Sequence, residues 1–168
     1  MISALALVAA ISFIGTLHSD LWPPHGHFQV SAKRGAHGQT ICQLESSAHD
    51  GADFFALALR GATEDGLEGV LMSNRPDIGQ VRHIDVTLDD EHAVSFVRAY
   101  THGGKDFTAV VGRLEPDHSA TLLALLRQRA VTAKSLTVIA PPLYRQIPAA
   151  GLSAALNEFD YCLQPLIP

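Results

Sequence analysis

The sequence predicts a mainly β protein of the α+β class. We expect an antiparallel β-sandwich or a curled meander with two C-terminal helices, preceded by one N-terminal transmembrane or signal helix. Residues 28–111 hold short apolar runs, spaced about ten residues apart and separated by Gly- and Asp-containing turns, which is typical of antiparallel strands. Apolar side chains recur at helical spacing in residues 120–130 and 152–163. Residues 1–17 contain no charged side chain.

Length and composition limit the classes of function. The 168 residues suffice for one globular domain and a terminal segment, and a content of 47% hydrophobic and 17% charged residues is that of a folded chain. Twelve basic and 17 acidic residues give a net charge of -5, which argues against nucleic acid as a partner. No run of Lys or Arg suggests a polybasic contact with lipid headgroups.

The first segment, residues 1–20, is expected to be a membrane anchor or a signal segment. A secretory signal peptide has basic residues before its apolar core and a small-residue cleavage site after it. Here no Lys or Arg precedes Lys33, and no A-x-A site follows Leu17. A membrane-spanning helix needs roughly 17–25 residues, so this segment lies at the short end of the range. We expect a retained anchor, with a cleaved signal and a buried core helix as the alternatives.

Residues 21–27 are predicted to form a Pro-rich linker between this segment and a β-rich globular domain at 28–168. Pro23 and Pro24 forbid helix continuation and favour an extended, stiff spacer. Trp22 lies at the border, where an indole suits the interface between membrane and water.

Within the domain, seven strands are expected from alternation and turn residues. The clearest is 82–88, where Ile84, Val86 and Leu88 point inward and the residues between them point outward. The polar stretch 46–53 is expected to be a loop, and residues 89–92 a tight polar turn. The other expected strands cover residues 28–32, 40–44, 54–59, 67–72, 94–100 and 107–111.

Two helices and one further strand are expected in the C-terminal third. Ser119 follows Pro116 and supplies N-cap chemistry for a helix through Ala130, with Leu122 and Leu126 on its apolar stripe. Residues 136–140 are predicted to form a strand that Pro141 ends. The last helix, 152–163, presents an amphipathic face that ends near Cys162.

The two cysteines, Cys42 and Cys162, are predicted to form a disulfide. The bridge would close a loop of about 120 residues, worth nearly 5 kcal/mol in the chain-entropy model. The alternative is that both are small buried hydrophobic residues. A catalytic role is not expected, because an apolar helix face is a poor place for a reactive thiolate.

The compartment follows from these features. Lys33 and Arg34, on the C-terminal side of the apolar segment, favour a cytoplasmic domain, whereas a disulfide favours an oxidising compartment. We expect a single-pass inner-membrane protein with its domain in the periplasm, or a soluble periplasmic protein if the segment is cleaved.

No motif predicts catalysis or a cofactor. The chain lacks G-x-S-x-G, and the acidic run from Asp89 to Glu91 lacks the spacing of a calcium loop. His25 and His27 form an H-x-H pair, the best candidate metal ligands, but zinc needs three or four ligands. We therefore expect no metal, no cofactor and no catalytic residue.

The stretch from Thr121 to Cys162 resembles the ending of the invasion-associated locus B family of small exported bacterial proteins. In that family a helix leads into a strand, and a G-[FL]-x-A-L helix closes the domain. Gly151, Leu152, Ala154, Ala155 and Leu156 stand at the positions of this signature. The resemblance implies a periplasmic β-rich domain with two packed helices. The mid-chain cysteine pair of that family is missing here.

The sequence therefore predicts a non-enzymatic, membrane-anchored accessory or interaction subunit of a membrane protein assembly. Its expected partners are the other subunits of the complex and the lipid bilayer, through residues 1–20. The first alternative is a cleaved, soluble periplasmic binding protein of the invasion-associated locus B type. A hydrolytic enzyme is the second.

Overall fold

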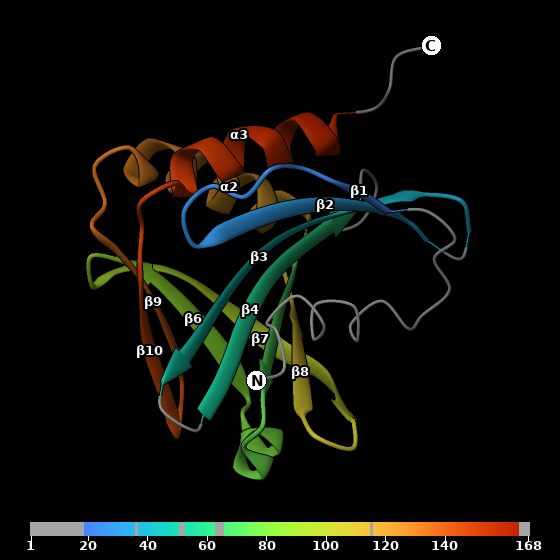
Figure 1. The fold of residues 1–168 in the computed structure, drawn as a ribbon, viewed down its shortest axis with the longest axis vertical. Helices are drawn as coiled ribbons and strands as arrows, with labels where there is room; N and C mark the ends of the chain where they lie inside the picture. Colours follow the sequence, from blue (N-terminus) through green and yellow to red (C-terminus); the bar gives the residue numbers. More distant parts are fainter. Residues whose placement is uncertain (1–18, 36, 51–52, 63–65, 115, 165–168) are drawn as a thin grey trace.

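A computed structural model describes residues 19–35, 37–50, 53–62, 66–114 and 116–164. It shows a mainly β protein of the α+β class, with one open antiparallel sheet and two helices (Figure 1). Nine strands have six to thirteen residues, and a three-residue strand, β1, is added at one edge. The strands are β1 (Ser19–Leu21), β2 (Phe28–Arg34), β3 (Thr40–Asp50), β4 (Asp53–Ala62), β5 (Glu68–Ser73), β6 (His83–Leu88), β7 (Glu91–Gly103), β8 (Thr108–Arg113), β9 (Ser135–Ala140) and β10 (Leu143–Pro148). The helices are α2 (Pro116–Ala130), α3 (Leu152–Leu163) and the short 3-10 helix η2 (Pro76–Gln80).

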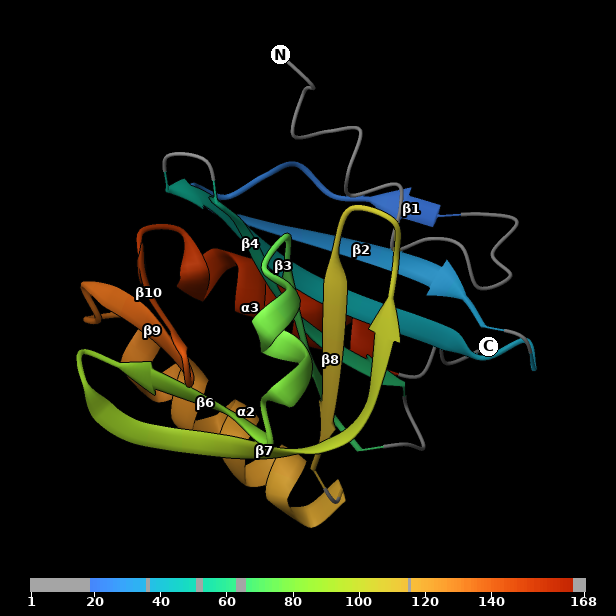
Figure 2. The same ribbon diagram turned by 90° about the horizontal axis from the view of Figure 1, so that it is seen from below.

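The sheet is one curled layer. Its strand order is β1-β2-β3-β4-β5-β8-β7-β6-β9-β10, and every neighbouring pair is antiparallel. Figure 2 shows the curl, with β2–β4 on one side of the molecule and β6, β9 and β10 on the other. All described strands join a single sheet, so the predicted sandwich is wrong. The predicted curled meander holds for β1–β5, whereas β8 and not β6 lies next to β5.

Both helices cover the same face of this sheet, which we call the inner face. Helix α3 packs on β2 and β3, and α2 packs on β6 and β7 (Figure 1). Leu122 and Leu126 of α2, and Leu156 and Phe159 of α3, are buried in one apolar cluster with the inward side chains of the strands. The helical stripes read from the sequence are thus the stripes that fill the core.

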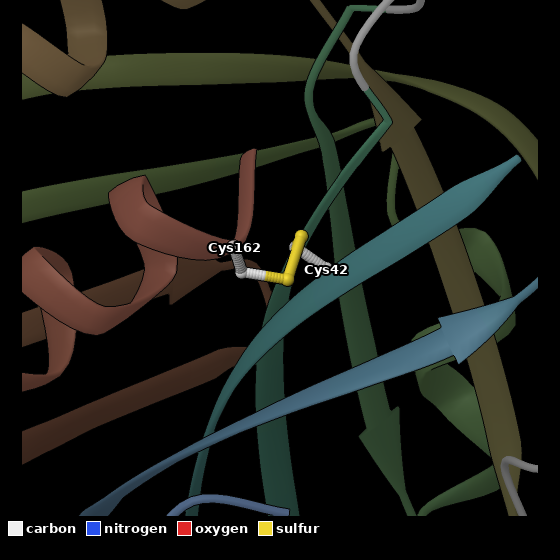
Figure 3. Close-up of a disulfide and its surroundings, with 2 residues drawn as sticks. All are labelled: Cys42 and Cys162. Atoms are coloured by element: carbon white, nitrogen blue, oxygen red, sulfur yellow. A yellow bond between two sulfur atoms is a disulfide. The ribbon is translucent and has the colours of Figure 1, made fainter. Parts of the chain in front are cut away.

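The disulfide joins the inner face to α3. Cys42 on β3 and Cys162 near the end of α3 are bonded, with their Cα atoms 5.8 Å apart, across a sequence separation of 120 residues (Figure 3). This confirms the predicted bridge. Since structural disulfides form and persist in oxidising environments, it indicates an oxidising, extracytoplasmic compartment.

Removing the bridge is expected to lower stability by up to about 5 kcal/mol, because the unfolded chain then gains the entropy of a long open loop. The variant Cys42→Ala/Cys162→Ala should unfold at a lower urea concentration than the oxidised protein. Dithiothreitol should shift the wild-type midpoint in the same direction and leave the variant unchanged. Equal midpoints for the oxidised protein and the variant would contradict a stabilising bridge.

Phe96 packs across two neighbouring strands where they carry no side chain. Its ring lies over Gly69 on β5 and its Cβ lies over Gly112 on β8, so that a Cβ on either glycine would sit 2.9 Å or 2.7 Å from it. Phe96 itself is fully buried. The two glycines therefore let β7 curl tightly against the centre of the sheet.

Gly112→Ala is expected to destabilise the fold by about 1–3 kcal/mol, because the new methyl group overlaps Phe96 and the neighbouring backbone must shift. Gly103→Ala is the matched control, since a Cβ at this end of β7 meets nothing within 4 Å. Urea unfolding of both variants measures the difference. A loss for Gly112→Ala no greater than for Gly103→Ala would rule out this packing.

Three local predictions need correction. The expected loop at 46–53 is instead the end of a hairpin, because β3 pairs with β4 as far as Asp50 and Asp53. Ser119 lies inside α2, which begins at Pro116, and its hydroxyl accepts a hydrogen bond from the Leu67 amide (2.8 Å) rather than capping the helix. Strand β10 was not predicted, since Pro142 and Pro148 bracket it.

The N-terminal segment, residues 1–18, lies outside the described residues. None of the described helices is long and apolar enough to cross a membrane. Within residues 21–27, the predicted Pro-rich linker, Leu21 belongs to β1 and the Trp22 amide donates to the Val30 carbonyl (3.1 Å). The Trp22 side chain is partly buried and packs against the apolar core. Its predicted place at a membrane interface stays a prediction.

Candidate functional site

The face of the sheet opposite the helices, the outer face, carries a row of polar and charged side chains. Strand registers align seven residues across seven strands, one on each. We call this set the outer row. It comprises Leu21, Ser31, Gln43, Arg60, Glu68, Arg113 and Val97. Their strand neighbours, such as Cys42, Leu59 and Phe96, belong to the apolar core, so the row points away from the helices.

Two arginines hold Glu68 at the centre of the outer row. Arg60 Nε donates to one carboxylate oxygen and Arg113 Nε to the other, each at 2.9 Å. The Arg113 guanidinium lies over the Tyr100 ring, 5.7 Å from its centre, and the Tyr100 hydroxyl lies 3.5 Å from Arg60. Each group restrains its neighbours, and the two guanidinium groups exceed the single carboxylate by one positive charge.

One end of the outer row is exposed. Val97 is 67% and Tyr100 41% exposed, and the Arg113 side chain is 62% exposed. These three residues, which we call the Val97 patch, come from the adjacent strands β7 and β8. Tyr and Arg are enriched in the centres of protein interfaces, and an apolar Val between them adds surface to bury.

The other end of the outer face is more enclosed. Burial raises the pKa of the Glu45 carboxyl, opposed by the Lys33 ammonium and by a hydrogen bond from the Gln43 amide. Burial likewise lowers the pKa of Lys33, against the attraction of Glu45. Glu45 and Lys33 at this end thus attract each other. The exposed side chains of Tyr100 and Arg113 belong to the Val97 patch.

A second polar region lies at the hairpin between β6 and β7. Leu88 pairs with Glu91, so Asp89 and Asp90 form a two-residue connection, and both have positive φ (50° and 63°), as in a type I′ turn. The predicted tight turn over residues 89–92 is confirmed at Asp89 and Asp90, whereas Glu91 and His92 belong to β7. The turn borders a cavity of about 590 Å³ that is lined by Asp89, Asp90, Lys134, Ser135, Gln146 and Pro148.

Asp89 lines this cavity and has a structural role. Its carboxylate accepts hydrogen bonds from the amides of Lys134 and Ser135, both at 2.9 Å, and from the Ser135 hydroxyl at 3.3 Å. These bonds, foremost those of the backbone amides, lower the pKa of Asp89. The carboxylate therefore ties the β6–β7 turn to the start of β9.

Asp89→Asn should lower stability modestly at pH 7, since asparagine tolerates the left-handed backbone but removes the charge. Because the pKa of Asp89 is depressed in the folded protein, its contribution is present above the unfolded value of 3.8 and is lost as the pH falls through the folded value. The gap in urea midpoint between wild type and variant should therefore close in acid. A gap independent of pH would contradict the assignment.

The fold separates the two histidines of the candidate metal pair. His25 Nε2 lies 2.8 Å from a carboxylate oxygen of Glu158 on α3, whereas His27 is exposed. No local pattern predicted this carboxylate, because α3 brings it from 133 positions further along the chain. Within the described ranges, no group of three or more His, Cys, Asp or Glu side chains is placed to hold a metal. His25 instead fastens the β1–β2 turn to α3.

The outer row and the cavity were not predicted as sites. A signal for the outer row exists: Arg60, Glu68 and Arg113 are single charges at the ends of apolar strands. Their meeting depends on the pairing of β5 with β8, which are 40 residues apart and which local patterns do not connect. The cavity likewise needs β10, which was not expected.

No family model, curated protein or solved structure matches this chain. The function of the protein is therefore inferred from the surfaces of its described residues.

Proposed function

We propose that the protein is a non-enzymatic, membrane-anchored interaction subunit that binds another protein of a membrane assembly through the Val97 patch. The observation that carries this proposal is the exposed group of Val97, Tyr100 and Arg113, held in place by Glu68 and Arg60 on the outer face. In this proposal residues 1–20 contact the bilayer, and the domain lies in the periplasm.

The Val97 patch has the properties of a prepared binding surface. Its residues stand on paired strands, and the Arg113 side chain is fixed between Glu68 and the Tyr100 ring, so little side-chain entropy remains to be lost on binding. The exposed Arg113 guanidinium beside Val97 can contact a partner that presents an acidic group beside an apolar one. These features support a protein partner over a nucleic acid, given the net charge of -5.

The disulfide supports the periplasmic placement, because both the anchored form and a cleaved, soluble form would meet an oxidising compartment there. The cleaved form is the alternative, and the resemblance to the invasion-associated locus B family is a reason to keep it. Intact-mass measurement of the protein from its native host separates the two. Retention of residues 1–20 supports the anchor, and their loss supports the soluble form.

The partner surface is tested by photo-crosslinking in the native host. A photoreactive amino acid at Val97 should give one discrete adduct of higher mass in the membrane fraction. The matched control is Val131, which is 72% exposed but lies after α2, away from the outer row. Adducts that are absent at Val97, or identical at both positions, would overturn the proposal.

A variant gives the energetic test. Val97→Asp with Tyr100→Ala should weaken the complex by about 2 kcal/mol or more, roughly thirtyfold, if these residues are central to the interface. Val131→Asp should leave it unchanged. Urea unfolding of each variant verifies that the fold is kept, since all three side chains are exposed.

A further inference from the structure

The outer face of β6, β9 and β10 is lined by side chains that form hydrogen bonds, and none of these residues belongs to the Val97 patch. Strand registers place Gln146, Thr137 and Thr87 side by side, and Pro148 beside Ser135. Tyr144 follows on the same face of β10 and is 53% exposed. This face continues into the 590 Å³ cavity beside the Asp89–Asp90 turn, a volume within the range of about 300–1,000 Å³ of small-molecule sites.

Several lining groups keep hydrogen-bonding capacity. Asp90 accepts only a long bond from the Thr137 hydroxyl (3.4 Å), through Oδ1. The Gln146 amide donates to Ser135 (3.0 Å), which leaves its carbonyl oxygen without a partner among the described residues. Lys134 engages the turn through its backbone amide, so its exposed ammonium is available as a donor. The cavity thus offers two acceptors and one strong donor.

A buried hydroxyl lies next to this set. Thr87 is only 4% exposed, and its Oγ1 has no hydrogen-bond partner among the described residues. Its strand neighbour Thr137 is fully buried and bonds to Asp90 at the cavity wall. A buried polar group without a partner costs free energy, but Thr87 lies behind the residues that line the cavity and is not one of them.

The mixed charges decide the class of ligand. Asp89 is occupied by three hydrogen-bond donors from Lys134 and Ser135, which leaves Asp90 as the one accessible carboxylate lining the described cavity. One carboxylate is too few for a metal site, and it repels an anion that Lys134 alone would attract. A neutral ligand with several hydroxyl groups can bind both the Asp90 carboxylate and the Lys134 ammonium, because each hydroxyl donates and accepts hydrogen bonds.

We propose that this cavity binds a neutral saccharide. Asp90 and the Gln146 carbonyl oxygen accept hydrogen bonds from sugar hydroxyls, and the Lys134 ammonium donates to a ring or hydroxyl oxygen. Pro148, and Tyr144 beyond the cavity on the same strand, offer apolar surface to the C–H side of the ring. The site is separate from the Val97 patch and goes beyond the proposed interaction with a protein.

The test is NMR titration of the folded domain with glucose, N-acetylglucosamine and maltose. At least one sugar should give saturable shifts of the Ser135 amide and of the Gln146 side-chain amide. Gln146→Ala and Asp90→Asn should each raise that Kd about fivefold, the loss expected for one hydrogen bond of about 1 kcal/mol. Gln128→Ala, at an exposed position on α2, should leave the Kd unchanged.

Three results would overturn the proposal: no saturable shift at these groups with any of the three sugars, equal effects of all three variants, or saturation by sodium phosphate or calcium chloride in place of sugar. Crosslinking at Val97 should be unaffected by Gln146→Ala, so the outcome is independent of the proposed protein partner.

Discussion

Helix α3 lies on β2 and β3 and buries Leu156 and Phe159 among the inward side chains of the sheet. A curled sheet with one apolar face is stable only when that face is covered, and α3 is the element that covers β2 and β3. Three contacts hold it there: the disulfide to β3, the His25–Glu158 pair to the β1–β2 turn, and the Arg127–Asp160 pair to α2. The order of the inner face depends on them.

Because the helices cover the inner face, the surfaces proposed for binding lie on the outer one. Two groups of polar side chains stand out there: the Val97 patch, on β7 and β8, and the cavity beside β9 and β10, with β6 between β7 and β9. The first combines apolar and charged side chains that are already fixed, which suits a protein surface. The second presents acceptors and a donor around a hollow, which suits a small polar molecule. The same sheet thus separates two kinds of binding chemistry.

The local patterns of the sequence predicted most elements because each depends on its own residues. The alternation of Ile84, Val86 and Leu88 sets the inner face of β6, and the stripe of Leu122 and Leu126 sets that of α2. Pairing between distant strands has no such local signal, so neither the position of β8 next to β5 nor the meeting of Arg60, Glu68 and Arg113 was predicted. The Cys42–Cys162 bridge was predictable only because the chain has no other cysteine with which either could pair.

An open sheet has two edges, and each edge strand is a possible template for another chain. Here β1 is only three residues long, and β10 ends at Pro148, which has no amide hydrogen to donate. Few backbone groups are thus left in register for an incoming strand. Over the described residues, these two edges are therefore poor templates for strand addition by another chain.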